Sequence, residues 1–513
     1  MSLLLGILTA VFLWRVIFSA WVDLIPDECS YWVWSRRLDW SYFDNSGMAA
    51  YLIRLSTEAL GQYTPFSVRF PFLVLSGLTT LLIYMTGVLL FGHKTRGLAA
   101  AVLFNLTPVA LLGGSAAMHD NALMFFWVLA LWAGARLVKS DDKRWCYVMG
   151  LAAGLCIQSK YTGVLVLPCL LLFFLWSGPY RKLLLAKEPW IGVLIAVIFT
   201  LPIIWWNYRH EWASVHHILF IGSGSPSVLR RLSDGIGYHI AQFGLLSPLL
   251  CFALLTATAA ALVRNLRRPQ PEQQLLLCFG LPVLLFGLMA FKGHVEANWS
   301  FMGYISTGIL AVEMILTAQS ANAKGIWNWF GRRYLKWALI LSVVPVALAV
   351  LHAWIGLLPA GIERRLGKAD RIIWETRGWK GLGDHVKSLE AAGYVIAGDS
   401  YQLCALLEFN VPGNPFVRYL APWKRPTVFD VWEPSFDNLQ GRTILYVSPK
   451  PLKPSSDALT TVYENFQTVE PLAPYHVMYH GESIREIYVY RCTGFDPWKP
   501  RRLGPRSLLY RDY

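Results

Sequence analysis

The chain has 513 residues, of which 55% are hydrophobic and only 15% are charged, and its mean hydropathy is +0.41. Soluble domains carry nearer a quarter charged residues, so this composition excludes an ordinary soluble protein. The net charge of +14 does not indicate nucleic acid, because the Lys and Arg residues cluster between apolar runs, where membrane orientation signals belong.

Continuous apolar runs along the first two thirds of the chain predict an α-helical polytopic membrane protein rather than a β-barrel, whose strands would alternate. Residues 1–22 lack a convincing cleavage site and are expected to be a retained first span. The runs 145–158 and 161–176 are short enough to be broken or partly re-entrant. The eleven candidate helices are 3–22, 70–91, 97–113, 121–138, 145–158, 161–176, 190–206, 241–263, 274–290, 300–318 and 336–358.

Basic residues mark every second connection between these helices. The short loops 92–97, 139–144, 177–188, 264–273 and 331–336 each hold at least two, so the positive-inside rule places them and the N-terminus in the cytoplasm. The other connections, and everything after residue 358, then face the opposite side. Most carboxylate and histidine combinations near the membrane fall on that side, which predicts one extracytoplasmic site built from several loops.

The segment after residue 358 changes character. It contains three strand-like runs (393–400, 442–450 and 485–492) and one helix-like stretch (401–409), punctuated by Gly, Pro and Asn. We therefore expect two domains, a membrane domain over 1–358 with a long first outer loop (23–69) that carries interfacial helices, and a small α/β domain over 359–513.

The first candidate site is the stretch "PDECSYWVW", which begins at Pro26. Acidic residues beside a membrane are costly unless they are used. Asp27 and Glu28 could begin a helix and complement its dipole, or they could act in catalysis, and both interpretations can hold together.

The aromatic and basic residues that follow predict a helix lying in the membrane interface. In this interpretation Tyr31, Trp32 and Trp34 form an aromatic belt, and Arg36 and Arg37 reach lipid headgroups.

Several other acidic and histidine residues lie in the outer connections. They are suitable ligands for a divalent metal such as Mg²⁺, Mn²⁺ or Zn²⁺, although their spacing matches no stereotyped zinc motif. A helix N-cap is the alternative for His119–Asp120, and a hydrogen-bonded interface histidine is the alternative for His294. The candidate metal ligands are Asp44, His119, Asp120, His294 and Glu296.

Two cations complete the candidate site. Lys160 lies between two apolar runs and needs a partner, for which a lipid phosphate is suitable. Arg209, in the outer connection after the seventh span, is a second phosphate candidate. The sequence has no P-loop and no G-x-G-x-x-G, G-x-S-x-G or H-E-x-x-H motif, which leaves nucleotide hydrolysis, hydride transfer and serine hydrolysis without support.

The whole arrangement resembles the bacterial GT-C glycosyltransferases. These include the protein O-mannosyltransferase-like enzymes and the aminoarabinose and galacturonate transferases of lipid A. The resemblance rests on the Asp-Glu doublet followed by "YWVWSRRLDWSYFD", on "SAAMHDNALMFFW", "QSKYTG" and "KGHVEANW", and on the C-terminal "AGDSYQLCALLEFNVPG" and "RPTVFDVWEP".

The resemblance implies roles for single residues. Asp27 would be the general base that deprotonates the acceptor, Glu28 would orient acceptor or base, and Asp44 would help to bind a metal or the donor phosphate. The other matched positions would contact metal or substrate; they are His119, Asp120, His294 and Glu296, and, for the substrate, Tyr42, Asn298 and Trp299.

Two departures from the family's pattern affect this assignment. Asn45-Ser46-Gly47 stands where relatives have Lys or His followed by two prolines, and Ala297 replaces a proline in the late loop. Because a cation is missing at position 45, we expect Lys160 or Arg209 to contact the donor phosphate.

The resemblance also implies the reaction and its place. The expected activity is inverting transfer of a sugar from a polyprenyl-phosphate donor to a lipid or glycan acceptor, on the periplasmic face of the bacterial inner membrane. Two alternatives stay open: a protein O-mannosyltransferase-like enzyme, and a transporter or flippase for a lipid-linked glycan. A flippase would predict broken helices in corresponding halves of the chain, and no such two-fold pattern is present.

Overall fold

The computed structural model describes residues 1–222, 227–320, 332–391, 393–420, 426–433, 435–452 and 464–497. The chain divides into two compact units. The helical unit comprises Met1–Trp21, Asn45–Tyr208 and Ile218–Ala347, and the sheet unit comprises Val22–Asp44, Arg209–His217 and Leu348–Tyr513.

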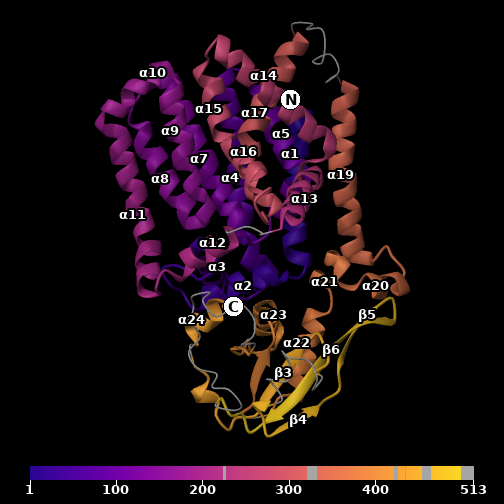
Figure 1. Cartoon of the computed structure of the whole chain (residues 1–513). Coiled ribbons are helices and arrows are strands. Elements are labelled where there is room, and N and C mark those ends of the chain that lie inside the picture. Colours follow the sequence, from indigo (N-terminus) through magenta and orange to yellow (C-terminus); the bar gives the residue numbers. More distant parts are fainter. Residues whose placement is uncertain are drawn as a thin grey trace. The chain divides into compact units, whose positions relative to one another are not determined.

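The helical unit is a bundle in which α7 packs against α4 and α8, and α17 packs against α5, α14 and α15 (Figure 1). Three of its helices, α11, α12 and α19, have residues assigned to both units. The helices are α1 (Ser2–Trp21), α3 (Met48–Leu60), α4 (Pro65–Phe91), α5 (Lys94–Asn105), α6 (Pro108–Gly113), α7 (His119–Ser140), α8 (Trp145–Ser159), η1 (Tyr161–Leu165), α9 (Val166–Trp176), α10 (Gly178–Arg181), η2 (Lys182–Leu185), α11 (Lys187–Arg209), α12 (Ala213–Gly222), α13 (Val228–Leu246), α14 (Pro248–Arg267), α15 (Pro271–Phe279), α16 (Leu281–Met289), η3 (Ala297–Ser300), α17 (Phe301–Ser320) and α19 (Arg332–Ile355).

All eleven predicted spans fall on helical segments, but not all of these could cross a membrane unbroken. Within the described ranges, eight helices are long and apolar enough to span a bilayer. A ninth is possible if Tyr161–Trp176 and Gly178–Leu185, which meet at 107°, form one broken span. The predicted span 145–158 is a shorter apolar helix, Trp145–Ser159. The chain is therefore a multi-pass membrane protein.

Prolines explain where two predicted spans differ from the structure. The predicted span 97–113 is divided into α5 and α6 because Pro108 begins a new helix, with Thr107 as its N-cap. The predicted span 241–263 crosses a break at Ser247, whose φ is +69°, so the actual span begins at Pro248.

The sheet unit contains one helix from the segment that follows α1, which is α2 (Pro26–Arg36), and a mixed α/β fold from the C-terminal third of the chain. Its remaining helices are α20 (Ala360–Leu366), η4 (Gly367–Ala369), α21 (Arg371–Thr376), α22 (Trp379–Leu389), α23 (Tyr401–Asn410), α24 (Val428–Trp432) and η5 (Asp437–Leu439). Its strands are β1 (Val395–Gly398), β2 (Arg418–Tyr419), β3 (Ile444–Ser448), β4 (Thr468–Pro471), β5 (Tyr475–Tyr479) and β6 (Glu482–Thr493).

The described strands form one sheet in the order β2-β1-β3-β6-β4, with β5 paired to β6 (Figure 1). Strand β1 is parallel to β2 and β3, whereas β6 is antiparallel to its neighbours. All five residues of β3 are buried, as expected for a central strand. The three strand-like runs and the helix-like stretch predicted from the sequence correspond to β1, β3, β6 and α23.

The units divide the chain differently from the predicted domains. The boundary before the C-terminal part lies between Ala347 and Leu348 rather than after residue 358, and residues 22–44 group with the sheet unit. Helix α2 packs directly against α23 of the α/β fold.

This packing overturns the interfacial interpretation of the first loop. Trp32 is fully buried against Phe409, with ring centroids 5.0 Å apart, and Trp34 stacks on Tyr42 at 4.5 Å. These side chains are core residues, because burial of their large aromatic rings removes apolar surface from water.

Arg36, the last residue of α2, and Arg37, which follows it, both contact residues of the sheet unit. Arg36 forms an ion pair of 2.7 Å with the buried carboxylate of Glu408. Arg37 lies over the rings of Phe416 and Trp432, at 4.2 and 4.7 Å.

Candidate functional site

The Asp-Glu doublet stands at the start of α2, as the capping interpretation predicted. Pro26 occupies the first helical position, where a missing N–H has no consequence. The backbone N–H of Ile25 donates to Oε2 of Glu28 at 3.1 Å, and Glu28 is only 1% exposed. This contact gives Glu28 a structural task at the helix start, and its orienting role in catalysis stays a prediction.

Asp27 has a different environment from its neighbour. Its carboxylate is partly buried and forms no hydrogen bond or ion pair within the described part of the chain. Burial, and after it repulsion from Glu375, raises the pKa of Asp27 to about 6, against the opposing effect of the Arg371 guanidinium. A carboxylate with a pKa near neutrality is suited to general-base catalysis.

Asp27 lines a cavity of about 700 Å³ within the sheet unit. One wall comes from η4, α21 and the start of α22, and the other comes from the residues that follow β1 and β3. The charged residues that line this cavity, which we call the Asp27 cavity, are Asp27, Lys368, Arg371, Glu375, Asp399 and Lys450.

Two of the carboxylates in the Asp27 cavity have partners there. Glu375 accepts hydrogen bonds from Nε and Nη2 of Arg371 at 2.8 and 2.6 Å. Asp399, which is 8% exposed, accepts a hydrogen bond of 3.2 Å from the Ser448 hydroxyl. The cavity therefore contains an available base together with fixed polar groups.

The other predicted residues of the sheet unit lie apart from this cavity lining. Asp44 is 3.6 Å from Nε2 of the buried His217, and Arg209 is exposed at the end of α11. Tyr42 is fully buried and donates its hydroxyl to the carbonyl of Trp34 at 3.0 Å. These contacts make Tyr42 a structural residue and do not support the substrate contact predicted for it.

Lys160 and Asp120 form a pair in the helical unit. The ammonium of Lys160 lies 2.9 and 3.1 Å from the two carboxylate oxygens of Asp120. The partner of Lys160 in the structure is therefore this carboxylate, and its contact with a lipid phosphate stays a prediction. His119, beside Asp120 at the start of α7, is 2% exposed.

The late loop of the helical unit is more open. Nε2 of His294 lies 3.0 Å from Oε1 of Glu296, and both side chains are more than half exposed. Asn298 and Trp299 lie in η3, where Trp299 packs against Phe286 with ring centroids 5.7 Å apart.

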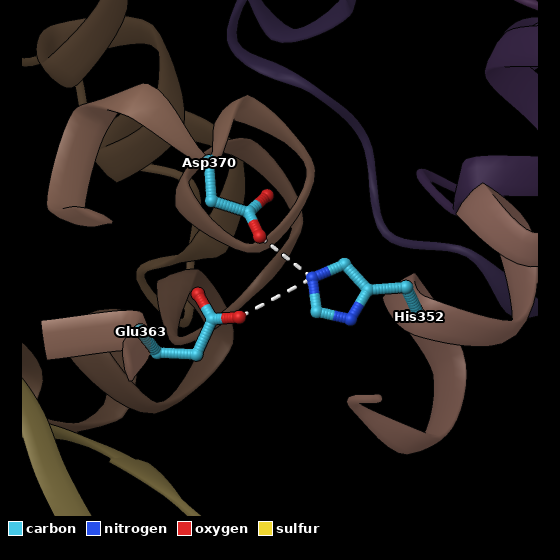
Figure 2. Close-up of side chains that lie close together, drawn as sticks. All are labelled: His352, Glu363 and Asp370. Carbon is cyan, nitrogen blue, oxygen red and sulfur yellow. Dashed lines mark hydrogen bonds and ion pairs between the residues drawn. The ribbon is translucent and has the colours of Figure 1, made fainter. Parts of the chain in front are cut away.

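Among the described residues, one group of three side chains is close enough to share a metal ion, and it contains none of the predicted ligands. Figure 2 shows this group, His352, Glu363 and Asp370, in the sheet unit. Nε2 of His352 lies 2.6 Å from Oδ2 of Asp370 and 3.3 Å from Oε1 of Glu363.

Hydrogen bonding at the other ring nitrogen of His352 does not fit a metal site. The backbone N–H of Leu357 donates to Nδ1 at 2.9 Å, so Nδ1 carries no proton. The ring proton must then be on Nε2, where it is donated to Asp370. A metal-binding histidine shows the opposite arrangement, since its second nitrogen donates a proton outward.

Sequence reasoning missed the cationic and aromatic wall of the Asp27 cavity. Lys368, Arg371 and Trp374 lie after the last predicted span, in a stretch that contains no recognised functional motif. The available signal is the interleaving of basic and aromatic residues in "GKADRIIWETRGW".

The bundle of membrane helices and the accompanying α/β unit agree with the architecture expected of a membrane glycosyltransferase. Comparison with known proteins agrees. Residues 44–206 match the family model of dolichyl-phosphate-mannose-protein mannosyltransferases. The chain is 30% identical over 475 residues to the lipid A galacturonosyltransferase RgtD of Rhizobium johnstonii, covering 84% of this chain and 94% of that relative.

Two further comparisons point the same way. An undecaprenyl phosphate-α-4-amino-4-deoxy-L-arabinose arabinosyl transferase of Pectobacterium carotovorum is 27% identical over 417 residues, covering 76% of this chain and 72% of that protein. The fold is similar to that of ArnT from Cupriavidus metallidurans bound to undecaprenyl phosphate, with a TM-score of 0.63, 14% identity, and coverage of 95% and 98%. The chain belongs to the GT-C glycosyltransferase family that includes the lipid A galacturonosyl and aminoarabinose transferases.

Proposed function

We propose that the protein is an inverting glycosyltransferase of the bacterial inner membrane. It transfers one sugar from a polyprenyl-phosphate donor to a lipid A-type lipid or another glycan acceptor of the cell envelope. The names of the relatives support this donor and acceptor chemistry. The basic residues in alternate loops support a periplasmic site.

The single observation that carries the proposal is the environment of Asp27. A carboxylate at the start of α2 lines a cavity, has no hydrogen bond or ion pair within the described residues, and has a pKa of about 6. This combination keeps it ionised at neutral pH while it retains appreciable affinity for a proton.

The reaction needs only one base. Asp27 accepts the proton of the acceptor hydroxyl as that oxygen forms a bond to the anomeric carbon. The bond from the anomeric carbon to the phosphate oxygen breaks, and polyprenyl phosphate leaves with the electron pair. A single displacement of this kind inverts the anomeric configuration, unlike double displacement by two carboxylates.

The leaving phosphate requires cations. Lys160, whose partner in the structure is Asp120, and Arg209 stay the predicted phosphate contacts. Asn298 and Trp299 stay predicted substrate contacts.

A divalent metal held by residues among Asp44, His119, Asp120, His294 and Glu296 stays a prediction. His294 and Glu296 are close enough to share one ion. When bound, such an ion would supply positive charge to the donor phosphate.

Replacement of Asp27 tests the proposal. We expect cells that carry Asp27→Asn to lose one sugar mass increment from a membrane lipid or surface glycan by mass spectrometry, while the protein level stays unchanged. Asp23→Asn is the matched control, because Asp23 is exposed outside the cavity. Retention of the increment in Asp27→Asn cells would refute the role of Asp27.

A protein acceptor is the second candidate, and the match of residues 44–206 to the protein mannosyltransferase model favours it. The same cells discriminate between the two: a mass increment that disappears from periplasmic proteins and not from lipids would identify a protein acceptor. A flippase would instead leave transfer insensitive to Asp27→Asn.

A further inference from the structure

The Asp27 cavity opens where ligands commonly bind in α/β sheets. Strands β2, β1 and β3 are parallel and lie in the order 2-1-3, so the chain reverses its direction of winding between β1 and β3. The crevice at the carboxyl ends of two such strands is the general ligand position in open α/β sheets. Here Asp399 and Ser400 follow β1, Lys450 lies two residues after β3, and all three line the cavity.

Two cations of the Asp27 cavity have no carboxylate partner among the described residues. Arg371 is paired with Glu375, but the ammonium groups of Lys368 and Lys450 form no ion pair in the part of the chain that the structure describes. Lys368 lies over the ring of Trp374, 5.2 Å from its centroid. Helix α23 begins at the same edge of the sheet and adds the partial positive charge of its N-terminus.

The wall beneath these cations is rigid. The guanidinium of Arg485 lies 4.2 Å from the centroid of Trp374 and 4.9 Å from that of Trp379. Trp379 is 6% exposed and donates its indole N–H to the carbonyl of Glu375 at 2.8 Å. These groups suit a sugar that carries an anionic group. They provide a fixed aromatic wall, carboxylates that accept hydrogen bonds from hydroxyl groups, and two ammonium groups.

We propose that the Asp27 cavity binds the saccharide head of the acceptor, and that Lys368 and Lys450 select acceptors carrying a phosphate or carboxylate. This inference rests on the proposed function, since it assumes that Asp27 is the base. The acceptor hydroxyl then faces Asp27, while Glu375 and Asp399 accept hydrogen bonds from other hydroxyl groups.

The donor also carries a phosphate, so the test must separate the two sources. We would measure binding of three probes to the full-length protein in detergent: bis-phosphorylated lipid A, the same lipid A after enzymatic dephosphorylation, and undecaprenyl phosphate. The variants are Lys368→Gln, Lys450→Gln and the double variant. Lys380→Gln is the matched control, because Lys380 is exposed on α22 and does not line the cavity.

We expect each cavity lysine variant to weaken binding of phosphorylated lipid A by about tenfold, as for loss of one charge-assisted contact. Binding of dephosphorylated lipid A and of undecaprenyl phosphate should stay unchanged, and Lys368→Arg and Lys450→Arg should keep most of the affinity. Both lysines are exposed, so thermal unfolding of the variants should match that of the wild type.

Three outcomes would overturn the inference: equal loss of affinity for both forms of lipid A, loss of undecaprenyl phosphate binding alone, or no effect in the double variant. These outcomes do not test the proposed function. That function is tested separately, by measuring whether the Asp27→Asn variant still transfers the sugar. That variant should still bind phosphorylated lipid A.

Discussion

At the scale of the residue, the environment of Asp27 favours general-base catalysis but lowers the stability of the folded protein. The base must be ionised, and burial together with Glu375, Asp44 and Glu28 raises its pKa to about 6, against the effect of Arg371. We therefore expect kcat/KM for sugar transfer to be constant above about pH 7 and to fall about tenfold per pH unit below about pH 6. A rate profile between pH 4.5 and 8.5 checks this.

The pH profile has an internal control. Lys380 does not line the Asp27 cavity, so Lys380→Gln and the wild type should show the same inflection. An inflection at the pKa of an ordinary exposed carboxyl, near 4, would contradict the environment described for Asp27.

The raised pKa of Asp27 also predicts a stability change. Because the folded protein disfavours the charged form of Asp27, ionisation of this residue lowers the free energy of unfolding. This loss is absent when the pH is below the ordinary pKa of 3.8 and complete above about pH 6. The difference corresponds to about 3 kcal/mol at neutral pH as an upper bound. Asp27→Asn should therefore be inactive and yet unfold at a higher temperature than the wild type at pH 7.5, with a smaller difference at pH 4.5.

At the scale of the element, small residues decide how closely helices approach. A Cβ at Gly150 in α8 would lie 2.1 Å from the carbonyl oxygen of Gly192 in α11, which backbone atoms cannot accommodate without a shift. Small residues of this kind permit close packing of membrane helices.

We therefore expect Gly150→Ala to separate α8 from α11 and to lower the free energy of unfolding by about 1–3 kcal/mol, as in overpacked cores. The measurement is thermal unfolding in detergent. Gly244→Ala in α13 is the control, because a Cβ there meets nothing within 4 Å. Its expected effect is neutral or slightly stabilising, since Ala is the better helix former. Equal destabilisation by both variants would contradict the packing argument.

A buried arginine shows a second way in which elements are held together. Arg15 of α1 is 1% exposed and donates to Ser76 of α4 and Asn105 of α5, both at 2.8 Å, and to the carbonyl of Ala110 in α6 at 2.6 Å. Arg15→Met keeps the length of the side chain but leaves these acceptors without their donor. It should lower the midpoint of thermal unfolding by several degrees, and an unchanged midpoint would show that water replaces the guanidinium.

At the scale of the whole molecule, the sequence predicts what depends on local pattern. Apolar length and basic loops locate the spans, and alternation with Gly and Pro punctuation locates β1, β3 and β6. The predictions that failed concerned residues whose environment depends on tertiary contacts. The aromatic residues of α2 have the composition of an interface helix, and only the presence of α23 shows that Trp32 and Trp34 are buried.

Like the fold, the candidate site was predictable from the sequence only where it depends on local pattern. The Asp-Glu doublet identifies Asp27, but its neighbours Lys368 and Lys450 are separated from it by more than 300 residues of sequence. The ion pair of Lys160 and Asp120 was not predicted, because sequence does not show that two opposite charges are close enough to pair; their predicted contacts with a phosphate and a metal stay untested.

The cluster of His352, Glu363 and Asp370 connects the last residues of α19 with α20 and the start of α21, the helix that carries Arg371 and Trp374. Burial raises the pKa of Glu363, and repulsion from Asp370 adds to this effect. Burial opposes ionisation of Asp370, but hydrogen bonds from His352 and from the N–H groups of Ile373 and Ile372 hold its pKa below the ordinary value. The cluster thus holds its carboxylates together by sharing protons and does not need a cation.

This arrangement predicts how the whole protein responds to metals. Treatment with EDTA, or addition of Zn²⁺ or Mg²⁺, should leave the unfolding midpoint of the sheet unit unchanged, because binding at Nε2 would require the Leu357 hydrogen bond to break. His352→Ala should lower that midpoint by several degrees, since it leaves Glu363 and Asp370 facing each other without the imidazole proton. A midpoint that rises with Zn²⁺ in the wild type but not in His352→Ala would instead identify a structural metal site.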